Sequence, residues 1–208
     1  RKIALPVRLA HMVAGAGDAK AAAAIAVLLT ERGLGGNDAD LDVRWSNFRR
    51  DRGAGAAHRL AENIAASAGG KKSADKRFSA AELLIHAYPD HIAKARGRPG
   101  QFLLANGSGA ELDPLHPLAG NPWLVIAAMQ GSAERMRILS AAELDEGAIA
   151  GLIPDAVETV EESVFDPARR ALRRQKLTRI GAIVLSTQTL PPPSGEAADR
   201  AMIAAVRE

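Results

Sequence analysis

The sequence has no cysteine among its 208 residues. Disulfide bonds, zinc–thiolate sites and cysteine nucleophiles are therefore excluded. A chain without cysteine fits a reducing compartment, and no apolar run in it approaches the length of a membrane span. No secretory signal is recognisable in its first residues. We therefore expect a cytoplasmic protein that has no membrane partner.

Aromatic side chains are scarce, with two tryptophans, one tyrosine and four phenylalanines. They are Trp45, Phe48, Phe78, Tyr88, Phe102, Trp123 and Phe165. Most of them stand at positions typical of a hydrophobic core. Stacking of nucleic-acid bases needs exposed aromatic rings. If this chain binds a nucleic acid, we therefore expect contacts to its backbone and little sequence specificity.

Motifs of catalysis and metal binding are also missing. The Gly69–Ser73 segment, GGKKS, resembles a phosphate-binding loop, but a second lysine stands where the hydroxyl that reaches magnesium should be. No serine lies in a Gly-x-Ser-x-Gly turn. The histidines lack the spacing of metal ligands; they are His11, His58, His86, His91 and His116. We expect no catalytic residue, no metal site and no cofactor within this chain.

The first third of the sequence has the pattern of an alanine-rich helical domain, which we place at residues 1–75. Asp18 is well placed to cap one helix, and Asp38 or Asp40 to begin another. Residues 67–76 predict an exposed linker. We therefore predict four helices followed by a change of structure.

Residues 76–96 predict short connecting helices. Ser79 and Glu82 have the spacing of a capping box, which marks a helix start. Pro89 suits the first position of a further short helix that runs through Ile92. This segment leads into a region of different character.

Residues 97–193 show short alternating runs that are broken by glycine, proline and asparagine, as strands are. The expected strands cover residues 101–105, 110–112, 123–129, 135–139, 157–165 and 180–186, and a helix is expected at 141–153. We interpret the order, strands followed by a helix and two further strands, as typical of a five-stranded OB-fold barrel. An SH3-like barrel is the main alternative. Residues 194–208 are expected to begin a helix that leads out, so the predicted fold class is α+β.

Positive charge is unevenly distributed, although the formal net charge is only +3. A small basic cluster lies at the boundary between the helical region and the strand-rich region. Residues 169–179 hold six basic side chains and no acid. Such a block is either a solvated face or a surface that follows phosphates. The candidate nucleic-acid-binding residues are Lys94, Arg96, Arg98, Arg135, Arg137, Arg173, Arg174, Lys176 and Arg179.

Seven segments carry a resemblance to a known family. They are LPVRLAHM at 5–12, AIAVLLTER at 24–32, RFS at 77–79, AYPDHIAKAR at 87–96, FLLANGSGA at 102–110, PWLV at 122–125 and IGAIVL at 180–185. In this order they resemble the C-terminal accessory region of the bacterial HrpB-type ATP-dependent helicases of the DEAH-box family. The chain departs from the family at one point, because Arg8 directly follows Val7 where relatives often have two further residues.

The resemblance implies that residues 1–75 form most of a ratchet-like, helicase-associated helical domain and that residues 97–190 form an OB-fold. It also implies that the chain is a fragment. The ATPase domains, with their ATP and Mg²⁺, would precede Arg1, and a further domain would follow Glu208.

The function that we expect is a non-catalytic region of an ATP-dependent helicase that engages single-stranded RNA or DNA and supports the enzyme's own ATPase domains. The alternative is a protein-docking module that regulates the ATPase without touching nucleic acid. A third possibility, an independent hydrolase, would need a nucleophile and a base that the sequence does not display.

Overall fold

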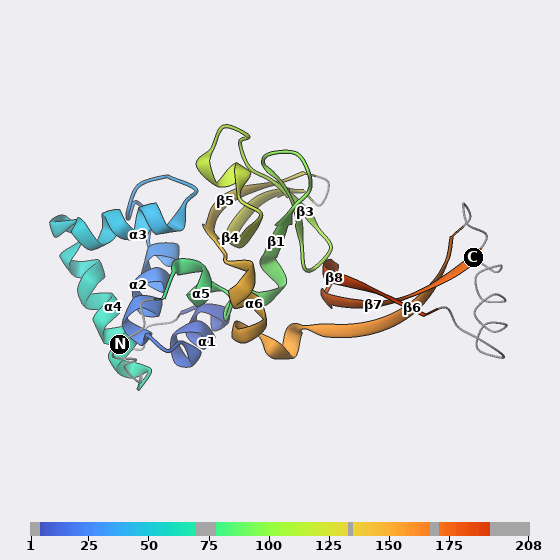
Figure 1. Cartoon of the computed structure of the whole chain (residues 1–208). Coiled ribbons are helices and arrows are strands. Elements are labelled where there is room, and N and C mark those ends of the chain that lie inside the picture. Colours follow the sequence, from blue (N-terminus) through green and yellow to red (C-terminus); the bar gives the residue numbers. More distant parts are fainter. Residues whose placement is uncertain (1–4, 70–77, 133–134, 167–170, 192–208) are drawn as a thin grey trace. The chain divides into compact units, whose positions relative to one another are not determined.

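The computed structural model describes residues 5–69, 78–132, 135–166 and 171–191. The chain divides into two compact units, residues 1–154 and residues 155–208, and each is described by itself. Helices and a β-barrel make up the first unit, and a three-stranded sheet makes up the second (Figure 1). The predicted mixed α+β class is confirmed. The expected helix at 194–208 and most of the expected linker lie outside the described residues.

The first unit begins with four α-helices. They are α1 (Val7–Gly15), α2 (Ala19–Thr30), α3 (Leu41–Arg50) and α4 (Gly55–Ser67), with a 3-10 turn, η1 (Arg52–Ala54), before α4. Helix α2 packs against the other three and is buried on most sides. Its alanines allow this, because small side chains let neighbouring helices approach on several faces. The four predicted helices are confirmed.

The predicted helix caps are also present. The Asp18 carboxylate accepts hydrogen bonds from the N–H groups of Lys20 and Ala21, at 3.1 and 3.0 Å, and Asp40 caps α3 in the same way. Ser79 and Glu82 form both hydrogen bonds of the capping box at the start of α5 (Ala80–Leu84), at 2.9 and 3.1 Å. These caps satisfy N–H groups that a helix start leaves without a partner.

A closed five-stranded barrel follows. Its strands are β1 (Ile92–Ala95), β2 (Gln101–Leu104), β3 (Gly109–Glu111), β4 (Trp123–Ser132) and β5 (Arg135–Glu143). They neighbour one another in the order β1-β2-β3-β5-β4, and β4 pairs with β1 to close the barrel. Only β3 and β5 run parallel among these pairs. The core inside includes Phe102, Leu104, Leu124, Ile126 and Ile138.

Three short helical segments flank the barrel strands: η2 (Pro89–His91), η3 (Pro117–Gly120) and α6 (Glu146–Leu152). The helix predicted from Pro89 through Ile92 is wrong beyond its first turn, because Ile92 already begins β1 and pairs with Val125. The helix predicted at 141–153 is too long at its start. Residues 141–143 continue β5, and Asp145 caps α6 through the Gly147 N–H.

The strands assigned to the barrel also need correction. The strands predicted at 157–165 and 180–186 lie outside it, in the second unit. The barrel instead takes its first strand from Ile92–Ala95, and a short 3-10 turn stands between β3 and β4. The barrel therefore has the predicted number of five strands, but not all of the segments that form it are the predicted ones. The domain boundaries after residues 75, 96 and 193 stay predictions.

The second unit contains an antiparallel sheet in the order β6-β7-β8. Its strands are β6 (Glu158–Asp166), β7 (Ala171–Ile180) and β8 (Ile183–Leu190), and a 3-10 turn, η4 (Pro154–Ala156), precedes them. Gly181, with φ of 51°, lies in the turn between β7 and β8. The basic block of the sequence therefore forms the central strand, β7.

The helices and the barrel of the first unit are joined by specific polar contacts. The Ala141 N–H of β5 donates to the Ala39 carbonyl at 2.8 Å, just before α3. Arg44 of α3 donates to the Ser140 hydroxyl of β5 at 3.4 Å, and burial lowers the pKa of its guanidinium. His116, before η3, lies 2.9 Å from the Asp38 carboxylate. The loop that leads to η3 is thus tied to the helical part.

The partly buried carboxyl group of Asp42 in α3 should make the stability of the protein depend on pH. Partial burial raises the pKa of its carboxyl group, although the hydrogen bond from the Ala80 N–H, at 3.2 Å, works in the opposite direction. A carboxyl whose folded pKa is raised contributes stability below its unfolded pKa, and this is lost as the pH rises through the folded pKa. We expect Asp42→Asn, which keeps an oxygen for Ala80, to be more stable than the parent at neutral pH.

Urea unfolding at neutral pH and in mild acid measures this difference. The gain in stability of Asp42→Asn over the parent should shrink as the pH falls below the ordinary pKa range of an aspartate, because the Asp42 carboxyl is protonated there. Asp40→Asn serves as the control, because asparagine caps a helix as well as aspartate does. A loss of stability in Asp42→Asn at neutral pH would contradict the expectation.

Candidate nucleic-acid interface

The turn from β1 to β2 presents two of the predicted basic residues to solvent. Arg96 and Arg98 are both exposed. The backbone of the turn is fixed by hydrogen bonds from the Arg96 N–H to the Gln101 carbonyl, at 2.8 Å, and from the Gln101 N–H to the Arg98 carbonyl, at 3.1 Å. We call residues 96–100 the basic turn. Two exposed arginines on a turn whose backbone is hydrogen-bonded in this way suit contact with phosphates.

Gly100 joins the basic turn to the end of β3. Its carbonyl accepts a hydrogen bond from the Leu112 N–H at 2.8 Å, and its own N–H donates to the Ala119 carbonyl at 2.9 Å. Its φ of 79° lies in the left-handed region, and a Cβ there would stand 2.3 Å from the Leu112 carbonyl oxygen. Only glycine therefore fits at this position.

Lys94 is less suited to strand contact than its neighbours. It lies on β1 opposite Trp123 of β4, and its ammonium nitrogen is 5.0 Å from the centre of the indole ring. This is a cation–π contact. The positive charge of Lys94 therefore stabilises the barrel surface, and its role in binding stays a prediction.

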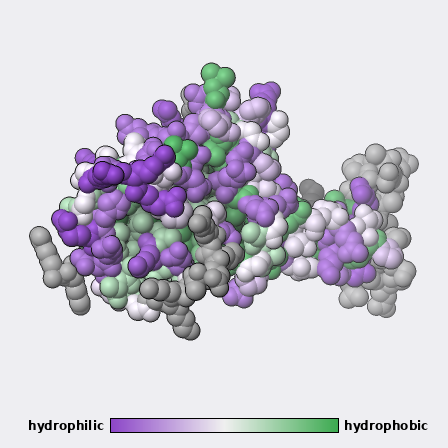
Figure 2. Space-filling view, turned by 60° about the vertical axis from the view of Figure 1, so that its left-hand side comes forward, coloured by the Kyte–Doolittle hydropathy of each residue, from purple (hydrophilic) through white to green (hydrophobic). Residues whose placement is uncertain are grey.

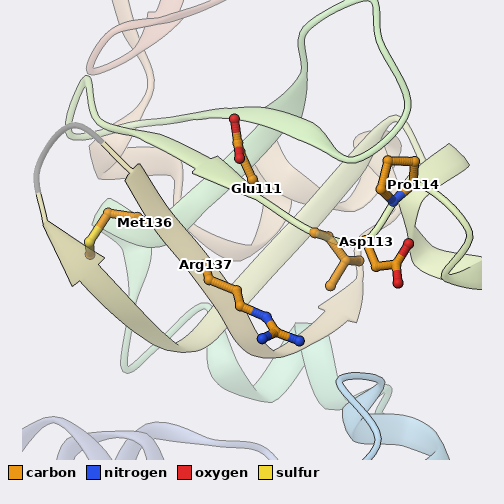
Figure 3. Close-up of a pocket in the computed structure, with 6 residues that line it drawn as sticks. Glu111, Asp113, Pro114, Met136 and Arg137 are labelled. Carbon is orange, nitrogen blue, oxygen red and sulfur yellow. The ribbon is translucent and has the colours of Figure 1, made fainter.

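Arg137 of β5 is exposed and lines a pocket of about 430 Å³. The pocket residues are Glu111, Leu112, Asp113, Pro114, Met136 and Arg137. They come together because β3 and β5 run parallel with Glu111 beside Arg137. Figure 3 shows the Arg137 side chain extending to the side where Asp113 lies, whereas the Glu111 side chain points the other way. The side chain of Arg135, the remaining predicted residue of β5, lies outside the described part of the structure.

The basic block of β7 meets acids on the neighbouring strand. Arg174 donates to the Glu161 carboxylate at 2.6 Å, and Arg179 donates to the Glu158 carboxylate at 3.3 and 3.2 Å. Lys176 stands directly opposite Glu161. Arg173, the fourth predicted residue of this strand, is also exposed. The sheet thus sets acids of β6 against bases of β7, which lowers its attraction for phosphates.

Two features of the first unit were mostly missed by the sequence analysis. The first is the pocket, of whose lining residues only Arg137 was a predicted site residue. The other is the polar face of α3, where Arg49 and Arg50 are exposed and the Arg49 guanidinium lies 4.6 Å from the centre of the Trp45 ring. Figure 2 shows hydrophilic side chains gathered over the helical part.

Within the described residues, histidines and acids form no group of three or more that could hold a metal ion. No helix in the same residues has both the length and the apolar character needed to cross a membrane.

The comparisons with known proteins agree with one another. No family model matches the chain. The ATP-dependent RNA helicase HrpB of Escherichia coli (strain K12) is 34% identical over 130 residues, which is 62% of this chain. The crystal structure of the E. coli DExH-box NTPase HrpB superposes with a TM-score of 0.76 and 31% identity, over 96% of this chain. The chain is a relative of HrpB.

A second crystal structure, of the E. coli DEAH/RHA helicase HrpB, agrees, with a TM-score of 0.74 and 29% identity over 96% of the chain. The resemblance predicted from the seven segments is confirmed. The chain spans only 16% of the length of the curated HrpB protein and 25% of each solved HrpB chain. The similarity is therefore to a segment of the HrpB protein.

Proposed function

We propose that this chain is an accessory region of an ATP-dependent helicase that holds the backbone of single-stranded RNA or DNA. In this proposal the barrel is an OB-fold, and ATP and Mg²⁺ are bound by other domains of the same enzyme. The chain would guide the strand and support those ATPase domains, without a catalytic residue of its own.

The observation that carries the proposal is the basic turn on a closed five-stranded barrel. Barrels with the OB topology bind oligonucleotides with strands 2 and 3 and with the loops between strands 1 and 2 and between strands 4 and 5. Arg96 and Arg98 lie in the first of these loops, and Arg135 follows the second. The relation to HrpB, whose name describes an RNA helicase, supports the same function.

Fluorescence anisotropy with a labelled single-stranded oligouridylate tests the proposal. We expect weak binding at low salt, and log K should fall linearly with log [salt] by about 0.7 per phosphate contact. The double variant Arg96→Gln/Arg98→Gln removes two contacts. Its slope should be smaller by about 1.4, and its affinity at low salt should be roughly tenfold lower.

Arg174→Gln is the matched control, because it removes one positive charge that is already paired with Glu161. It should change the affinity by less than about twofold. If the parent chain did not bind the oligonucleotide at low salt, or if the double variant bound as tightly as the parent, the proposal would fail. The first outcome would favour the alternative of a protein-docking module.

A further inference from the structure

The pocket beside Arg137 combines apolar walls with one guanidinium group and two carboxylates. Leu112, Pro114 and Met136 supply the apolar surface, and the charged side chains are those of Arg137, Asp113 and Glu111. We propose that this pocket receives a guanine base of the bound strand. The inference rests on the proposed function, because it assigns one base-reading position to the same binding surface.

The charges of the pocket favour a base over a phosphate. Asp113 is an exposed carboxylate that lines the pocket, and it would repel a phosphodiester group. A nucleobase has no net charge and offers flat faces to the apolar walls. Phosphates are better accommodated by Arg96 and Arg98 on the neighbouring basic turn.

The polar groups select guanine among the bases. An arginine donates two parallel hydrogen bonds to O6 and N7 of guanine, which are both acceptors. A carboxylate accepts from N1–H and N2–H₂ of the same base. Adenine places a donor amino group where guanine has O6, so it would oppose the Arg137 guanidinium. Guanine therefore satisfies both Arg137 and Asp113.

The pocket is held in place by its backbone. The Asp113 carboxylate accepts a hydrogen bond from the Leu115 N–H at 2.9 Å, and the Asp113 carbonyl accepts one from the His116 N–H at 2.9 Å. Leu112 is buried, and its N–H donates a hydrogen bond to the carbonyl of Gly100 in the basic turn. A strand whose phosphates contact the turn thus passes next to the pocket, and one base can enter it.

Anisotropy with the 208-residue chain and oligouridylates that carry one central guanosine, inosine, 7-deazaguanosine or adenosine tests the inference. We expect guanosine to bind about fivefold more tightly than adenosine. Inosine, which lacks the N2 amino group, and 7-deazaguanosine, which lacks the N7 acceptor, should fall between them.

Two variants should abolish the guanosine preference, measured as the ratio of the affinities for the guanosine and adenosine strands. Arg137→Gln removes the paired donors, and Asp113→Asn replaces the acceptor yet keeps an oxygen for the Leu115 N–H. Glu111→Gln is the matched control. It removes the same charge from a side chain that points away from Arg137 (Figure 3), so the preference should persist.

Equal binding of the guanosine and adenosine strands by the parent would overturn the inference and leave the proposed function standing. A preference that survives both Arg137→Gln and Asp113→Asn would also overturn it. Free GMP that competes as strongly as the guanosine strand would show a nucleotide site instead of a strand site. If no oligonucleotide bound at all, the proposed function would fail together with the inference.

Discussion

Gly100→Ala is expected to destabilise the first unit by about 3 kcal/mol or more, a large loss for one methyl group. The new Cβ would stand 2.3 Å from the Leu112 carbonyl oxygen and 3.3 Å from its carbon, and both atoms belong to the backbone. The left-handed φ of 79° adds strain of about 1–2 kcal/mol for any residue with a Cβ. Relief by a shift would weaken the hydrogen bond between Gly100 and Leu112.

Gly97→Ala is the matched control, because Gly97 lies in the same turn with a φ of 73°, but a Cβ added to it would have no atom within 4 Å. Its free energy of unfolding should fall only by the strain of the left-handed backbone, about 1–2 kcal/mol. Urea unfolding followed by tryptophan fluorescence measures both variants. Equal losses would mean that the backbone of residues 112–114 yields to the new methyl group, contrary to the expectation.

Local signals in the sequence predicted the helical part well. Asp18, Asp40 and the Ser79–Glu82 box act on N–H groups two or three residues away, so their effect is visible without knowledge of the fold. The turn at Asn106 and Gly107 is local in the same sense, and Gly107 has a φ of 89°. These features can be predicted because sequence neighbours decide them.

The first barrel strand could not be predicted in this way, because distant residues decide it. Ile92–Ala95 follows a proline-started turn and looks like the end of a helix, yet it pairs with Leu104 and Leu124 on its two sides. Likewise, the alternation of apolar and polar residues indicates that residues 157–165 are extended, but it does not show which strand they pair with. Pairing with β7 places it in a separate sheet. Strand partners are a tertiary property that local propensity does not encode.

The candidate interface also contains some features that the sequence could predict and others that it could not. The basic turn could be predicted, since arginines among glycines and a proline indicate an exposed turn. The pocket could not, because Glu111 and Arg137 become neighbours only through the parallel pairing of β3 and β5. The ion pair of Arg174 with Glu161 could not be predicted either, because it depends on the pairing of β6 with β7. Charge counted along the chain therefore overstates the positive surface of β7.

Trp123→Ala is expected to lower the free energy of unfolding by about 3–5 kcal/mol. The indole is only 1% exposed and lies at the start of β4, where the Trp123 carbonyl accepts the Leu144 N–H at 3.1 Å. Truncation leaves a cavity and removes the ring beneath the Lys94 ammonium. Lys94→Met keeps most of the packing and removes the cation–π contact, so the free energy of unfolding should fall by much less than in Trp123→Ala, by about 1 kcal/mol for that contact.

Trp45 then reports how far the damage extends, because it is the tryptophan that remains in Trp123→Ala and it is buried in the helical part. Helices and barrel belong to one compact unit and share the contacts of Ala39 with Ala141 and of Asp38 with His116. We therefore expect the Trp45 fluorescence transition in urea to shift to lower concentration together with the far-UV circular dichroism. A Trp45 transition that stayed at the parental midpoint while the barrel unfolded would show that the helical part is stable without it.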